Sequence, residues 1–154
     1  MYIKENIFDK KKLIAIVFKY NKKKFSGINF LTKKSLSLQV GEMSHPSKHV
    51  ITPHYHLSTK KINKTMSEFL FILKGKVKVK FYEKTKRLIK TRIIKKKDML
   101  LLIEGGHGFE MLKKTEMVEI KQGPFKSDKD KIRFWLKVKK FIPVNTPVIT
   151  KKDI

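Results

Sequence analysis

The chain has 154 residues, of which 40% are hydrophobic and none is cysteine, and this is enough for one domain with a sizeable core. Without cysteine it has no disulfide and no thiolate metal site, so any metal ion would bind His, Asp, Glu or water. The formal net charge of +25 would attract anionic ligands, including phosphorylated sugars and nucleotides.

The positive charge comes mainly from lysine. Arginine, the residue favoured for bidentate contacts with phosphates and bases, occurs only at Arg87, Arg92 and Arg133. The lysines are spread along the chain in short runs rather than gathered in one arm. We therefore expect a solvated lysine surface, and nucleic-acid binding ranks last among the functions considered.

The longest apolar run near the N-terminus covers residues 13–18 and lies between lysine clusters. It is too short for a transmembrane span or an ordinary signal-peptide core, and no small-residue cleavage site follows it. We expect a cytoplasmic protein without a membrane partner.

Short β-rich segments separated by turns recur along the chain, and helix signals are scarce. A helix within residues 6–12 is not favoured. The predicted strands are residues 13–20, 27–32, 35–41, 49–56, 68–73, 76–82, 87–94, 98–103, 109–112 and 116–122. Lys74-Gly75 is predicted to turn a hairpin between two of them, and Gly105-Gly106 to turn the chain at His107. Residues 126–154 are expected to form a C-terminal strand or arm.

The clearest periodicity is in the second arm of that hairpin. Val77, Val79 and Phe81 alternate with lysines, as expected for a strand with one buried and one solvated face. Many short strands at this spacing predict an all-β sandwich or barrel.

Two imidazoles stand two residues apart at His54 and His56. In an extended strand such side chains point to the same side, so one strand would offer two nitrogen ligands to a metal. An isolated His-x-His is more often packed or solvated than a ligand pair. The metal interpretation therefore depends on further ligands, for which Glu68 and His107 are the candidates.

Two motifs carry a resemblance to a known family. The first is His54-x-His56 with Glu68 followed, after six residues, by Gly75; the second is Asp98 with Gly105-Gly106-His107. Together they resemble the two motifs of the cupin superfamily, over residues 49–124. The resemblance implies a single domain, 1–154, folded as a cupin-type double-stranded β-helix, or jelly-roll barrel, with its core at about 35–125.

By the same resemblance, His54, His56 and His107, with Glu68 as fourth ligand, would converge on one divalent metal ion. Imidazole and carboxylate ligands suit Fe, Mn, Ni or Zn and leave positions open for water or substrate. The stretch between His56 and Glu68, residues 57–67, is longer than in the family motif and is expected to be a loop at the barrel mouth. Cupins resembling this chain are often homodimers.

A narrower likeness concerns residues 105–111 and 119–125, which resemble small cupin-like proteins found among surface-polysaccharide and sialic-acid-type sugar genes. It implies a metal-binding cupin acting on a small polar, sugar-derived or anionic molecule. The reaction would be that of an isomerase or epimerase, with Glu68 or a histidine released from the metal transferring a proton. The alternatives are a non-catalytic cupin that senses a ligand or metal, and an Fe(II) dioxygenase.

Overall fold

The computed structural model describes residues 1–60, 62–63, 65–124 and 131–134, and in these residues the chain is all-β. The strands are β1 (Tyr2–Asp9), β2 (Lys12–Tyr20), β3 (Gly27–Phe30), β4 (Gly41–Ser44), β5 (Glu68–Tyr82), β6 (Leu88–Lys95), β7 (Met99–Leu102) and β8 (Gly106–Lys121). No helix in the described part of the chain is long and apolar enough to cross a membrane.

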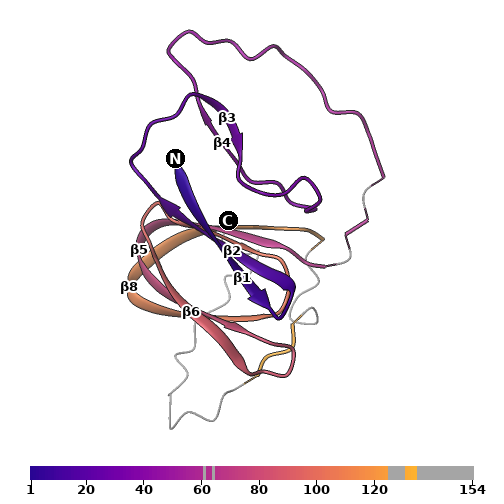
Figure 1. The fold of residues 1–154 in the computed structure, drawn as a ribbon, viewed down its shortest axis with the longest axis vertical. Coiled ribbons are helices and arrows are strands. Elements are labelled where there is room, and N and C mark those ends of the chain that lie inside the picture. The colour runs from indigo at the N-terminus through magenta and orange to yellow at the C-terminus, as the bar shows by residue number, and fades with distance from the viewer. Residues whose placement is uncertain (61, 64, 125–130, 135–154) are drawn as a thin grey trace, which may run out of the picture.

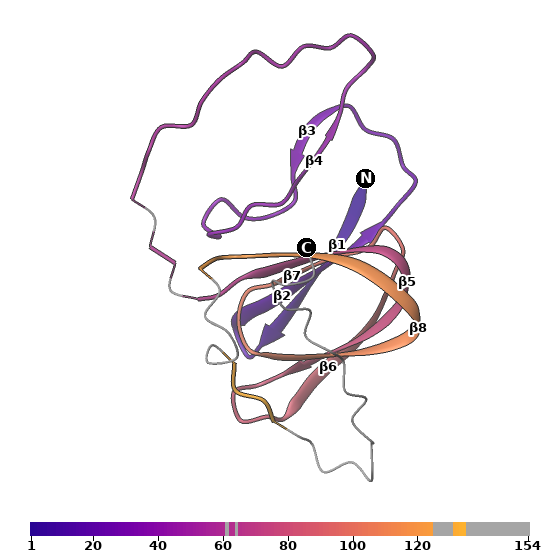
Figure 2. The ribbon, with the colours of Figure 1, turned by 180° about the vertical axis from the view of Figure 1, so that it is seen from behind.

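Six of the strands form one antiparallel sheet in the order β1-β2-β7-β5-β6, with β8 paired to β5. The sheet curls into a half-barrel, and β5 and β8 together form the arched ribbon in Figures 1 and 2. The first half of β5 pairs with β7 and the second half with β6, while β8 follows β5 along both halves. The remaining strands, β3 and β4, form a separate two-stranded sheet.

Each face of the curled sheet packs a different apolar cluster. The concave face carries alternate side chains of β2, β5 and β7, among them Val17, Leu70 and Leu100. Val79 from the second half of β5 and Ile94 from β6 belong to the same cluster. On the opposite face, the remaining side chains of β2 and β7 pack against residues 31–40. Both faces are buried in the middle of β2, Ile14–Phe18, and along the whole of β7, and these stretches are accordingly apolar throughout.

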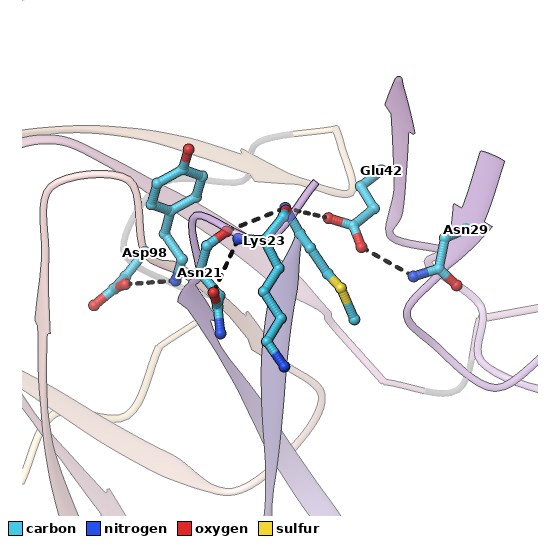
Figure 3. Close-up of polar contacts among 7 residues, drawn as sticks. Asn21, Lys23, Asn29, Glu42 and Asp98 are labelled. Carbon is cyan, nitrogen blue, oxygen red and sulfur yellow. Dashed lines mark hydrogen bonds and ion pairs between the residues drawn. The ribbon is translucent and has the colours of Figure 1, made fainter. Parts of the chain in front are cut away.

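Polar contacts hold the two-stranded sheet to the end of the curled sheet. Asn29 of β3 donates a hydrogen bond to Glu42 of β4 at 2.9 Å, and the other carboxylate oxygen of Glu42 lies 3.5 Å from the Met1 amine (Figure 3). The Met1 amine donates in turn to the backbone oxygens of Asn21 and Lys23. The polar face of the β3–β4 sheet is therefore the one turned toward the rest of the molecule.

The predicted strands are confirmed at residues 13–20, 27–32, 76–82, 87–94 and 98–103, within one to a few residues at their ends. The hairpin predicted at Lys74-Gly75 is wrong, because β5 runs through both glycine and lysine as one strand. The two strands predicted over 109–112 and 116–122 are likewise one strand, β8. Continuous pairing between β5 and β8 explains both corrections, since a bulged ribbon bends without reversing.

Two further expectations are corrected. Residues 35–40 form no strand, and the next strand begins only at Gly41; residues 6–9, where a helix was not favoured, belong to β1. Residues 49–56, the expected histidine strand, form no strand either. Most of the C-terminal strand or arm expected over 126–154 lies outside the described residues. The all-β class is confirmed, whereas the cupin topology and the single-domain boundary stay predictions.

Candidate functional site

Two of the four predicted site residues meet at the mouth of the half-barrel. Glu68 is the first residue of β5 and His107 the second residue of β8. Along the ribbon they are far apart, because Glu68 pairs with Lys121 and His107 with Phe81. Nevertheless His107 Nε2 lies 3.3 Å from Glu68 Oε2. The curl of the ribbon therefore brings its two ends into contact.

The bend responsible for this contact lies at the middle of β5. The β5–β8 register shifts three times between Ile72 and Val77, and each bulge adds local twist and bend. Gly75 has a φ of 93° there, and a Cβ on it would lie 2.3 Å from the backbone oxygen of Lys114. Glycine is required at this position by both backbone conformation and space.

The environment of Glu68 favours its ionised form. Its side chain is 11% exposed, and the hydrogen bond from His107 is the main cause that lowers the pKa of its carboxyl. Burial, the second-largest influence, raises this pKa, and the charges of His107, Lys121 and Lys131 lower it further. Glu68 is therefore a carboxylate at neutral pH, held in a positive field.

Further side chains gather around this pair. The Phe109 ring lies 5.4 Å from that of His107, measured between ring centroids. Lys121 belongs to the same face of the ribbon as Glu68, and it lies 3.4 Å from Glu119. Gln122 accepts a hydrogen bond from the backbone N–H of Ser67 at 2.7 Å, which fixes the chain just before Glu68.

Several of these residues were not identified by the sequence. Tyr82 and Phe134 pack edge to face at 5.3 Å, beside Gly106. Phe134 and Lys131 come from a part of the chain beyond the motifs, where the lysine-rich composition gives no signal. The hydrogen bond between Gln122 and the backbone of Ser67 joins residues 55 positions apart, a contact that no local pattern indicates.

The other two predicted site residues lie elsewhere. His54 and His56 are exposed on residues 45–66, a segment that runs around the outside of the β3–β4 sheet and returns to the curled sheet at β5 (Figures 1 and 2). Their ring centroids are 5.2 Å apart. The histidine-strand prediction is wrong in this structure, because none of the described strands pairs with this segment.

One contact of His54 bears on its use as a ligand. Its Nδ1 lies 2.9 Å from the backbone oxygen of Thr52, and since a carbonyl only accepts, the tautomer that forms this hydrogen bond carries its proton on Nδ1. The Nε2 of a neutral His54 is then free to bind a metal, an orientation typical of metal-ligating histidines. His45 and His49 stack with centroids 4.1 Å apart and do not join the other pair.

Taken together, the described residues contain no group of three or more His, Asp or Glu side chains placed to hold a metal. Comparison with known proteins adds nothing to this picture. No family model, curated protein or solved structure matches the chain. The likeness to cupins therefore rests on the residues named above.

Proposed function

We propose that the protein holds one divalent metal ion through Glu68, His107, His54 and His56, and binds a small anionic or sugar-derived molecule beside it. The observation that supports this most is the 3.3 Å contact between His107 Nε2 and Glu68 Oε2. These two residues were selected from separate motifs, and chance would seldom bring two such distant residues together at a barrel mouth.

The donor chemistry fits a first-row metal. Glu68 supplies a carboxylate that is ionised at neutral pH, and His107 supplies an imidazole. The neutral tautomer of His54 that donates from Nδ1 to Thr52 would present its Nε2 to the metal. Such ligands suit Fe, Mn, Ni or Zn. When bound, the ion would act as a Lewis acid that polarises a carbonyl or hydroxyl of the ligand. Within one chain, the donors form two pairs rather than one set of four.

The protein's own residues would recognise an anionic ligand. Lys121 and Lys131 both act on Glu68 electrostatically, so a ligand phosphate or carboxylate at the mouth would enter a positive field. Phe109 beside His107 offers an apolar surface for a sugar ring or other small molecule. An isomerase or epimerase acting on a sugar derivative is the reaction class this arrangement suits.

A specific observation favours a second candidate, a non-catalytic module that binds the metal and ligand without chemistry. A general base works best with a pKa near the operating pH, whereas the pKa of Glu68 is lowered. A carboxylate of this kind is a better ligand than a proton acceptor. Turnover of a bound sugar derivative, abolished in Glu68→Gln, would decide for the enzyme.

The proposal is tested by metal content. Wild-type protein supplied in turn with Fe, Mn, Ni and Zn salts should retain about one ion per chain, and His107→Ala should lose most of it. His49→Ala is the control, because His49 is an exposed histidine that stacks on His45 and is not one of the proposed ligands, and this variant should keep the ion. A wild type without metal, or equal loss in both variants, would contradict the proposal.

A further inference from the structure

The segment that carries His54 and His56 has almost no partners of its own. Among the described residues of 45–66, the backbone–backbone hydrogen bond formed is that from His49 N–H to the oxygen of Pro46, at 3.3 Å. Large apolar side chains are nevertheless exposed along it: Val50, Ile51, Tyr55 at 85%, Leu57 and Ile62. Such a run of exposed apolar residues indicates a surface that is covered in the functional state.

Within the described residues, β8 is an edge strand of the half-barrel, and its free side suits this segment. In the described sheet β8 pairs with β5 alone, and Val118 and Ile120 on β8 are exposed. These two residues lie opposite Phe71 and Phe69 on the outer face of the sheet, whereas Glu119 and Lys121 share the concave face with Glu68. A long edge strand with exposed apolar side chains is a template for another strand.

The alternation along the segment fits that edge. If residues 54–57 were extended beside the end of β8, His54 and His56 would point to one side and Tyr55 and Leu57 to the other. With the histidines on the concave face, they would approach Glu68. Tyr55 and Leu57 would then lie on the outer face, where Val118 and Ile120 are exposed.

A second exposed apolar surface indicates which chain supplies the strand that would pair with β8. The β3–β4 sheet turns its polar side inward, through Asn29 and Glu42, and leaves Ile28, Phe30 at 62% and Met43 exposed on the other side. Ile28 and Met43 are direct partners across the two strands, so this face is continuous. A segment folding back onto its own half-barrel would leave it uncovered, whereas a second copy packed there would cover it.

We infer that two copies of the chain exchange residues 45–66, so that the segment of each copy adds a strand to β8 of the other. His54 and His56 of one copy then meet Glu68 and His107 of the second, and each dimer has two composite sites. A two-fold axis makes both exchanges equivalent. This inference rests on the proposed function for the identity of the site, but strand exchange itself is testable without metal.

The start of the segment also favours exchange. It leaves β4 at Ser44, shortly after Val40, which belongs to the cluster on the outer face of the sheet. Glu68 belongs to the concave face, with Leu70 and Ile72. Within one chain, the segment therefore begins on the outer face of the sheet, whereas Glu68 lies on the concave face.

Cross-linking tests the exchange directly, because the chain has no cysteine of its own. Two differently tagged chains, Tyr55→Cys and Ile120→Cys, are co-expressed and treated with a short bismaleimide. Both positions are exposed, so the substitutions should not disturb folding. We expect a covalent dimer that carries both tags. Lys11→Cys, in the exposed β1–β2 turn, replaces Ile120→Cys as the matched control and should give none.

The contrary result is equally clear. If the chain is monomeric, or if a single chain carrying both cysteines cross-links within itself while the mixed chains do not, the segment returns to its own half-barrel and the exchange is wrong. The measurement needs no metal, so it stands even if the wild type binds none.

Complementation tests the composite site. His54→Ala/His56→Ala and His107→Ala chains should each bind no metal alone, but their co-expressed mixture should recover about a quarter of the wild-type Zn²⁺ content per chain. Half of randomly formed dimers pair unlike chains, and each of these has one intact site. No recovery, with wild type fully loaded, would place all four ligands in one chain and overturn the exchange. An empty wild type would instead remove the proposed function.

Discussion

The carboxylate of Asp98 is buried at the turn between β6 and β7, where three donors meet it. It accepts hydrogen bonds from the backbone N–H groups of Tyr20 and Lys95, both at 3.0 Å, and from Lys19 Nζ at 2.8 Å. Figure 3 shows its contact with the end of β2. Asp98 belongs to the second cupin-like motif, and in this structure it joins the end of β2 to the β6–β7 turn.

We expect Asp98→Ala to lower the free energy of unfolding by about 3 kcal/mol, since it leaves two backbone donors and a lysine without their acceptor. Urea denaturation measures the change. Glu116→Ala is the control, because Glu116 pairs with Lys74 at 3.7 Å on the surface, and its loss should stay within about 0.5 kcal/mol. Equal effects of the two substitutions would contradict the role given to Asp98.

At the scale of single residues, the sequence could predict one contact of the candidate site but not the others. The motif spacing singled out Glu68 and His107, and the structure brings them together. It could not show that Lys131 acts on Glu68 or that Phe134 packs on Tyr82, because these contacts join parts of the chain that no periodicity relates.

Among the elements, β5 decides the shape of the half-barrel, and Gly75 decides the bend of β5. Gly75→Ala should destabilise the protein by about 3 kcal/mol, because a positive φ and a clash with the backbone of Lys114 and Thr115 act together. The matched control is Gly27→Ala, where φ is also positive at 86° but no atom lies within 4 Å of the added Cβ. Strain alone predicts a loss of about 1 kcal/mol there.

Thermal unfolding of the two variants checks this difference. Similar losses in Gly75→Ala and Gly27→Ala would mean that backbone conformation alone sets the requirement for glycine at Gly75, and that the close approach of β8 is relieved at little cost.

Strands were predicted well wherever the burial pattern is local. Val77, Val79 and Phe81 are buried as their alternation indicated, and the apolar runs of β2 and β7 are buried on both faces. Lys74-Gly75 was misread because a glycine with positive φ serves a bulge as readily as a turn. Which strands pair, and hence the half-barrel, depends on contacts distant in sequence, which a local pattern does not encode.

At the scale of the whole molecule, the two edges of the main sheet path face each other. β1 and β6 stand at opposite ends of the strand order, yet Glu5 of β1 accepts hydrogen bonds from Arg92 Nε at 2.7 Å and from Lys90 Nζ at 3.3 Å, both on β6. By register all three side chains belong to the concave face. This ion pair bridges the opening that the curled sheet leaves between its edges.

The bridge makes part of the stability depend on pH. Hydrogen bonding from Arg92 is the main cause that lowers the pKa of Glu5 below its ordinary value of 4.5, with Lys90 adding to it and burial opposing it. A lowered folded-state pKa means that the unfolded chain takes up the proton first, so the contribution is complete above pH 4.5 and is lost as the pH falls through the lowered value. Because the pair is partly exposed, its contribution at neutral pH is about 1 kcal/mol.

Glu5→Gln should therefore be less stable than wild type at pH 7, and the difference should shrink toward zero well below pH 4. Urea denaturation at a series of pH values gives both curves. Glu110→Gln is the matched control: the pKa of Glu110 is also lowered, by hydrogen bonds from Lys78 and Lys80, but its pair with Lys78 spans strands that are already hydrogen-bonded. It should lose less than Glu5→Gln at pH 7. If Glu5→Gln followed the wild-type curve at every pH, the opening between β1 and β6 would be held by apolar packing alone.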